Sequence, residues 1–256
     1  MSSWCDKLAS TPGVGFRITQ HFAPIEIILN ELSPILDRAT ESEAKNITID
    51  QTATFFSTAF NTNDGFKYAI DQSKVSVHFN HRLKLKHVSG GPPIMEMLSK
   101  PLPYTTLLPV VASKLVEATL LLPNAKDRAV EQVGIISATP IAHEDVPPGI
   151  RRLMDYVGRP WNGMLDGFNL TINAQLRETA ELTERCIHTL VMPEDKEQLL
   201  TIQFDWQRKF KTAWQISKSN LEQILEDAQK SALKYFEELA EGSRFDEILI
   251  RATANV

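Results

Sequence analysis

Hydrophobic and polar positions along the chain form the same succession of patterns twice. Each half reads as a short strand, a helix, a run of alternating strands and a longer amphipathic helix. In the first half these elements are expected at 14–22, 24–40, 46–88 and 105–122. In the second half they are expected at 129–142, 148–157, 166–214 and 219–241. A run of strands leaves an apolar face for the closing helix to cover, which is typical of α+β proteins.

Two segments show the strand pattern most clearly. The first predicts a strand with one wet face through 75–86, because polar residues alternate there with Val75, Val77, Phe79, Leu83 and Leu85. The second predicts a long strand or a bent pair, because one apolar face runs through Leu200, Ile202, Phe204, Trp206, Phe210 and Trp214. Asn63-Asp64-Gly65 predicts a hairpin turn, since Asp-Gly tolerates the positive φ that such turns require.

The helices are predicted from their stripes and their ends. Ser219 and Glu222 match a capping box at the start of the last helix, and Gly242 suits its C-terminal cap. Pro24 suits the first turn of the helix at 24–40, and Pro34 is expected to kink or end it. The two long helices carry the apolar stripes Leu108, Val111, Leu115, Ala118, Leu122 and Leu221, Ile224, Leu225, Ala228, Ala232, Tyr235, Phe236, Leu239.

These patterns predict an α+β protein of two similar halves, 1–122 and 123–256. In each half a long helix would pack on a curved antiparallel sheet. The likeness is one of layout, because no residue-level identity links the halves. The pattern leaves open whether the halves share one sheet or form two domains.

Composition restricts the class of protein and its expected location. With 256 residues, 43% hydrophobic and 23% charged, the chain has the composition of a folded globular protein. No apolar stretch reaches the roughly 18–20 residues of a membrane span, since Leu107 to Leu122 is interrupted by Ser113, Lys114 and Glu117. The N-terminus lacks the apolar core of a signal peptide, so a cytoplasmic location is expected. Cys5 and Cys186 do not suggest a disulfide framework.

Motifs for catalysis and for cofactors are not found in the sequence. It holds no Walker loop, no G-x-G-x-x-G and no G-x-S-x-G, so no catalytic residue and no cofactor is predicted. His78, His81 and His87 would lie along one strand with His78 on the opposite face. No metal site is therefore predicted there.

Two kinds of binding site remain as candidates. A helix over a curved sheet can enclose an apolar cavity, which would be lined by Phe79, Leu83, Phe204, Trp206, Leu225 and Tyr235. A basic sheet face could follow a single-stranded nucleic acid, using Arg82, Lys84, Lys86, Arg151, Arg152, Arg208, Lys209 and Lys211. Trp161 and Trp206 would then stack on bases. The net charge of −5 favours the simpler interpretation of these cations as a solvated face.

The strand pattern Val133-Gly134-Ile135-Ile136-Ser137-Ala138-Thr139-Pro140-Ile141 and the closing helix at 224–239 carry a resemblance. In layout the chain resembles a sporadically distributed, uncharacterised bacterial protein family of about this length, which implies no catalytic residues. The leading hypothesis is a non-enzymatic interaction protein, an accessory component of a bacterial multi-protein system. A protein partner or a homodimer would use the apolar segment Phe245 to Ile250 and the Pro/Gly-rich loop at 147–167. Nucleic acid is the less favoured partner, and no membrane partner is expected.

Overall fold

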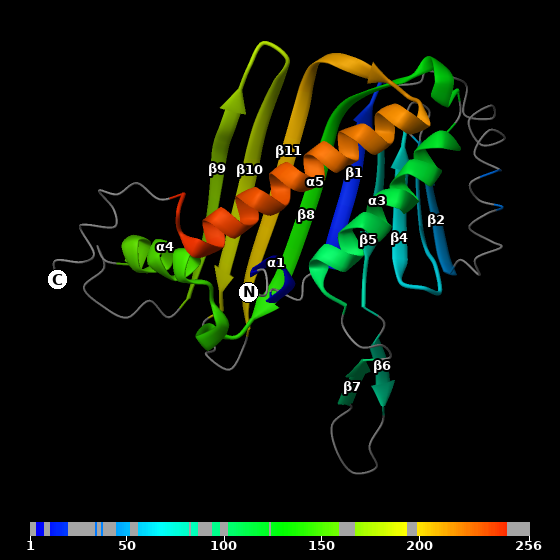
Figure 1. Cartoon of the computed structure of the whole chain (residues 1–256). Helices are drawn as coiled ribbons and strands as arrows, with labels where there is room; N and C mark the ends of the chain where they lie inside the picture. The colour runs from blue at the N-terminus through cyan, green and yellow to red at the C-terminus, as the bar shows by residue number, and fades with distance from the viewer. Residues whose placement is uncertain are drawn as a thin grey trace.

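The fold is α+β and is built on one large antiparallel sheet (Figure 1). The computed structural model describes residues 4–7, 11–19, 34, 37, 45–51, 56–81, 83–86, 94–97, 102–122, 124–158, 167–193 and 199–244. The nine strands of the sheet are β1 (Thr11–Ile18), β2 (Lys45–Gln51), β3 (Phe56–Asn61), β4 (Phe66–Asp71), β5 (Lys74–Phe79), β8 (Ala129–Ile141), β9 (Phe168–Glu178), β10 (Leu182–Met192) and β11 (Leu200–Gln215). The helices are α1 (Trp4–Lys7), α3 (Tyr104–Leu120), α4 (Pro148–Gly158) and α5 (Lys218–Glu241).

The strand order is β2-β3-β4-β5-β1-β8-β11-β10-β9, and every neighbouring pair is antiparallel. The first strands of the two halves, β1 and β8, therefore lie side by side at the centre. Each is flanked on its other side by the last strand of its own meander, β5 or β11. Strands of both halves thus pair within the one nine-stranded sheet.

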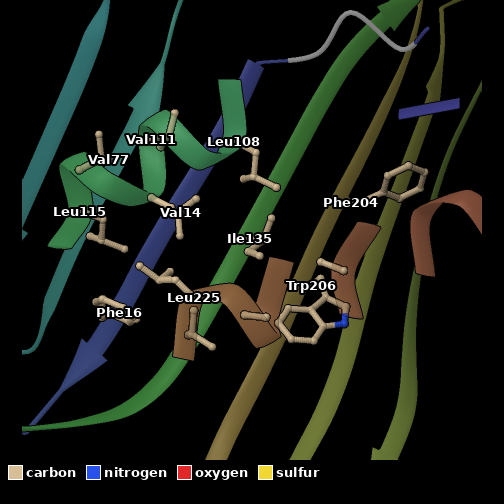
Figure 2. Close-up of a cluster of buried hydrophobic side chains, with 14 of the residues drawn as sticks. Val14, Phe16, Val77, Leu108, Val111, Leu115, Ile135, Phe204, Trp206 and Leu225 are labelled. Atoms are coloured by element: carbon tan, nitrogen blue, oxygen red, sulfur yellow. The ribbon is translucent and has the colours of Figure 1, made fainter. Parts of the chain in front are cut away.

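The hydrophobic core lies between this sheet and the two long helices. Figure 2 shows Leu108, Val111 and Leu115 of α3 over Val14 and Val77 of the sheet, and all five side chains are at most 1% exposed. Leu225 of α5 lies on the same side as Ile135 and Trp206. Each such side chain stabilises the fold by about 1.5–3 kcal/mol through its removal from water.

The expectation of one strand through 75–86 is wrong. Strand β5 ends at Phe79, and Leu83–Lys86 forms β6, which pairs with β7 (Ile94–Met97) in a separate two-stranded sheet. The reason is that the pairing of β5 with its neighbours β1 and β4 stops at this point. The ladder with β1 ends at His78 and the ladder with β4 ends at Phe79, so the backbone beyond has no partner in the main sheet.

The other strong elements occur where the patterns predict them. Helix α3 occupies most of 105–122, β8 and α4 coincide with 129–142 and 148–157, and β11 is a single strand of 16 residues. The helix expected at 24–40 falls outside the described residues except at Pro34 and Asp37, and so does the segment 245–250. None of the described helices has both the length and the apolar character that a membrane span requires.

The ends of α5 confirm one predicted cap and correct the other. Gly242 adopts φ 85° and its N–H donates to the carbonyls of Glu238 and Leu239, so it is the expected C-terminal cap. The N-terminal cap is Ser217, whose side chain accepts from the backbone N–H of Asn220 at 3.2 Å. The capping box predicted at Ser219 and Glu222 is therefore wrong, because the helix begins earlier, at Lys218.

This correction is testable. Ser217→Ala removes the acceptor for an orphan helix N–H and should lower the free energy of unfolding by about 1 kcal/mol in urea titrations. Ser219→Ala is the matched control, because Ser219 is already inside the helix and its hydroxyl contacts only that of Ser217. An equal loss in both variants would contradict the assignment of Ser217 as the cap.

Candidate functional site

Helices cover one face of the nine-stranded sheet, and no described helix covers the other. Helices α3 and α5 cross the same face (Figure 1), α1 packs on both of them, and α4 packs on α5. We call the opposite face the open face, since no helix of the described ranges lies on it. The strands alternate accordingly: Val14, Phe16 and Ile18 of β1 are buried under the helices, whereas Arg17 between them is exposed.

The register of the central strands brings small residues together on the open face. Gly15 lies opposite Ser76 of β5 on one side and Gly134 of β8 on the other. Gly134 in turn lies opposite Gln207 of β11, which lies opposite Arg185 of β10. We call this line across the sheet the glycine row: Ser76, Gly15, Gly134, Gln207 and Arg185.

A parallel line of long polar side chains lies two residues further along the strands. It consists of Lys74, Arg17, Gln132 and Lys209, each opposite the next on adjacent strands, and we call it the basic row. On the other side of the glycine row lie His78, Gly13, Ile136 and Asp205, the His row.

The glycine row forms the floor of a hollow of about 420 Å³. Its lining includes Arg17, Lys74 and Gln132 at one end and His78 and Ile136 at the other. Small-molecule sites have volumes of roughly 300–1,000 Å³, so the hollow has the size of a ligand site. It lies at the centre of the open face.

Hydrogen bonds hold one wall of the hollow in place. Gln207 Oε1 accepts from Arg185 Nε at 2.8 Å, from Arg185 Nη2 at 2.6 Å and from Gln132 Nε2 at 3.0 Å. Gln207 Nε2 donates to Asp205 Oδ2 at 2.7 Å. Four side chains from three strands are thus fixed relative to one another, which lowers the entropic cost of binding.

The opposite wall contains His78, which lies against the backbone of Gly13. A Cβ atom on Gly13 would be 2.2 Å from His78 Nδ1, so only glycine permits this position of the ring. Burial, with a further contribution from Lys74 and Lys67, lowers the pKa of His78 below its usual value. The ring is therefore neutral at pH 7 and can both donate and accept a hydrogen bond.

The cations of the open face outnumber its carboxylates around the hollow. Arg17, Lys67, Lys74, Arg185 and Lys209 surround the centre, against the three carboxylates Asp71, Glu131 and Asp205. Arg17 Nε lies 3.7 Å from Glu131 Oε2, but these side chains are 66% and 42% exposed, so solvent weakens the pair. The centre of this face is positive although the whole chain has a net charge of −5.

The residues predicted to line an apolar cavity lie on the other side of the sheet, apart from Leu83, whose side chain is not among those described. Phe204, Trp206, Leu225 and Tyr235 are at most 5% exposed within the core under α5, and Phe79 is half-buried beside Phe66. Phe204 stacks on Phe236 with ring centroids 5.1 Å apart. None of these five described residues lines the hollow on the open face.

The predicted basic residues do not gather in one place. Lys209 lies in the basic row, but its neighbour Arg208 is buried on the helix side, where it pairs with Glu184 Oε1 at 2.7 Å. Lys211 pairs with the exposed Glu178. Arg151 and Arg152 are on α4 and donate to backbone carbonyls. Lys84 and Lys86 belong to β6, and their side chains, with Arg82 and Trp161, lie outside the described residues.

Sequence reasoning missed Arg17, Lys74, Arg185 and the two glycines of the floor. A signal for the floor was present, because Gly15 lies between Val14 and Phe16 and Gly134 lies between Val133 and Ile135. Each glycine therefore occupies the face opposite the buried residues of its strand. No group of His, Cys, Asp and Glu in the described ranges is arranged to hold a metal ion.

A second polar cluster is buried beneath α5. His188 of β10 is 5% exposed, its Nε2 lies 2.9 Å from Tyr235 Oη, and its Nδ1 lies 3.9 Å from Cys186 Sγ. Burial lowers the pKa of His188 to about 4 and raises the pKa of Cys186. Both side chains are buried, and the contact of His188 with Tyr235 joins β10 to α5.

The low pKa of His188 predicts a pH dependence of stability. In the unfolded chain His188 is protonated below its ordinary pKa of 6.5, whereas in the folded chain it is protonated only below about pH 4. The unfolded state therefore binds more protons between these values, and the free energy of unfolding decreases as the pH falls through this window. Between pH 7 and pH 5 this loss should be about 2 kcal/mol. Urea unfolding of the wild type and of His188→Gln, whose amide does not titrate, measures it as a difference. Parallel pH profiles would contradict the prediction.

The chain matches no protein-family model, and no curated protein matches it. Its function is therefore inferred from the surface just described.

Proposed function

We propose that the protein is a cytoplasmic, non-enzymatic binding protein whose open face holds a single-stranded nucleic acid by its phosphate backbone. The observation that carries this proposal is the position of Lys74, Arg17 and Lys209 on an uncovered face of the sheet. Such a role suits an accessory component of a bacterial multi-protein system.

The basic row is not explained by the usual protection of sheet edges. Lysines on edge strands prevent unwanted pairing with other chains. Strands β5, β1 and β11 are each paired on both sides, so their cations protect no edge. Neighbouring strands are ~4.8 Å apart, which places the ends of the basic row about 14 Å from each other. A polyanion laid across the strands would meet these cations in succession.

The contacts would be led by phosphate rather than by stacked aromatic rings. Of the two tryptophans expected to stack on bases, Trp206 is fully buried beneath α5 and Trp161 lies outside the described residues. Binding that depends on phosphate contacts releases counterions and weakens steeply with salt, by a log–log slope of about −0.7 per contact for single strands. Salt dependence is therefore the diagnostic property.

Fluorescence anisotropy with a labelled single-stranded oligonucleotide tests the proposal. Replacing Lys74 and Lys209 together by Gln should flatten the log–log salt slope by about 1.4 and weaken binding at low salt. The matched control replaces Lys218 and Lys230 of α5 by Gln, which makes the same charge change on side chains 73% and 69% exposed on the helix side. Equal effects of the two pairs, or binding that ignores salt, would contradict the proposal.

A second candidate is self-association through β9, which ends the sheet as far as it is described. Its helix-side residues Phe168, Leu170 and Ile172 are only half-buried, and no Lys or Pro occurs from 168 to 176. An edge strand without these protections can pair with a second copy of itself.

Light scattering coupled to gel filtration tests this homodimer. Ile172→Lys places a charge on the apolar side of the edge and should convert a dimer into a monomer. Thr201→Lys, at an exposed position of the doubly paired β11, should leave the mass unchanged. A wild-type protein that stays monomeric at high concentration would exclude this candidate.

We also infer that the two halves form an internal structural repeat. Support comes from the arrangement of β1 beside β5 and β8 beside β11, each followed by a long helix on the same face. Superposing β1, β5, β4 and α3 on β8, β11, β10 and α5 should match strand directions and helix crossing. A mismatch in either would contradict the repeat.

A further inference from the structure

The glycine at position 134 is not explained by the fold. It lies on the central strand β8, where glycine costs about 0.5–1 kcal/mol relative to a residue with a side chain. A Cβ atom there would meet nothing closer than the carbonyl oxygen of Trp206, at the ordinary distance of 3.8 Å. Its φ is not positive either, so neither packing nor backbone geometry requires glycine. By contrast, a Cβ on Gly15 would crowd Ser76 Cβ at 3.1 Å.

Glycine within a strand often marks a bulge, a tight bend, or a place where a ligand or another backbone approaches closely. Gly134 pairs in regular register with Gly15 and Gln207, so it does not mark a bulge. Gly134 forms the floor of the 420 Å³ hollow, and any larger side chain there would point into it. The absence of a side chain therefore preserves the hollow.

The two ends of the hollow differ in chemistry. The basic row supplies Arg17 and Lys74 at one end, and the His row supplies His78 and Ile136 at the other. Gly13 and Arg17 are four residues apart on β1, so the two rows are separated by about 13 Å. A ligand that spans the floor must combine an anionic group with a partly apolar, hydrogen-bonding group.

We infer that this hollow binds one nucleoside monophosphate unit, with its phosphate at Arg17 and Lys74 and its base over the glycine floor toward His78 and Ile136. Such a unit is either a free nucleotide or one nucleotide of a bound single-stranded nucleic acid. The second case rests on the proposed function, whereas the first does not.

The hydrogen-bonding groups around the floor suit a base. Asp205 presents a carboxylate and Gln207 the NH₂ group of its amide along one wall, and neutral His78 faces them from the other. The amide oxygen of Gln207 already accepts from Arg185 and Gln132.

Cations still exceed carboxylates at the phosphate end. The basic row supplies Arg17, Lys74 and Lys209 there. The carboxylates near them are Asp71 and Glu131, and the pair of Glu131 with Arg17 at 3.7 Å is weakened because both side chains are exposed to solvent.

The open space at Gly134 provides a sharp test. Gly134→Val places a side chain in the hollow, and its Cβ would lie at the ordinary distance of 3.8 Å from the nearest atom. Because valine also suits a strand better than glycine, the melting temperature should be kept or raised. Isothermal titration with AMP, GMP, CMP and UMP should show binding to the wild type that weakens about tenfold or more in the variant. Thr189→Val, which adds valine to the open face outside the hollow, is the matched control and should bind as the wild type does.

Anisotropy with the oligonucleotide separates the two sources. Loss of both mononucleotide and oligonucleotide affinity in Gly134→Val supports a strand-bound unit. If the wild type binds mononucleotides, Gly134→Val does not, and neither shows salt-dependent oligonucleotide binding, the hollow is a free-nucleotide site. That result overturns the proposed function alone. If oligonucleotide binding depends on Lys74 and Lys209 but is unchanged in Gly134→Val, and no mononucleotide binds, this inference alone is overturned. A wild type that binds neither probe overturns both.

Discussion

Phe16, Leu115 and Trp206 are completely removed from water where α3 and α5 cross the sheet, and this apolar contact is the constraint on which the rest depends. Side chains of a strand alternate between its two faces, so burying one set under the helices directs the other set to the open face. The open face is therefore a consequence of the core. Its hollow and its cations exist because β1, β5, β8 and β11 each have both neighbours and cannot rotate.

The part of the core under α5 is less uniform than the part under α3. It contains the Arg208–Glu184 ion pair, with Arg208 Nη2 also 2.8 Å from Ser231 Oγ, and the contact between His188 and Tyr235. A buried ion pair adds little net stability, but removing one partner leaves an uncompensated charge. These contacts join β10 and β11 to particular turns of α5 and so specify how the helix lies on the sheet.

Arg208 and Lys209 show how far the site could be foreseen. They are adjacent in a run of basic residues, yet one forms the buried ion pair and the other joins Lys74 and Arg17 on the open face. A linear cluster of charge on a strand is always divided between two environments. The hollow combines residues from β1, β5, β8, β10 and β11, and local patterns carry no information about which strands become neighbours.

The sequence by itself determined the α+β class, the long helices with their apolar stripes, the C-terminal cap at Gly242 and the apolar face that runs through 200–214. These features depend on periodicity and on backbone preferences, which act over a few residues. Only the tertiary structure decided that strands of both halves pair in one sheet, that β5 ends at Phe79, and that Gly15 and Gly134 meet beside Arg17. Those outcomes depend on which strands pair and in which register, and pairing is set by contacts between residues far apart in the chain.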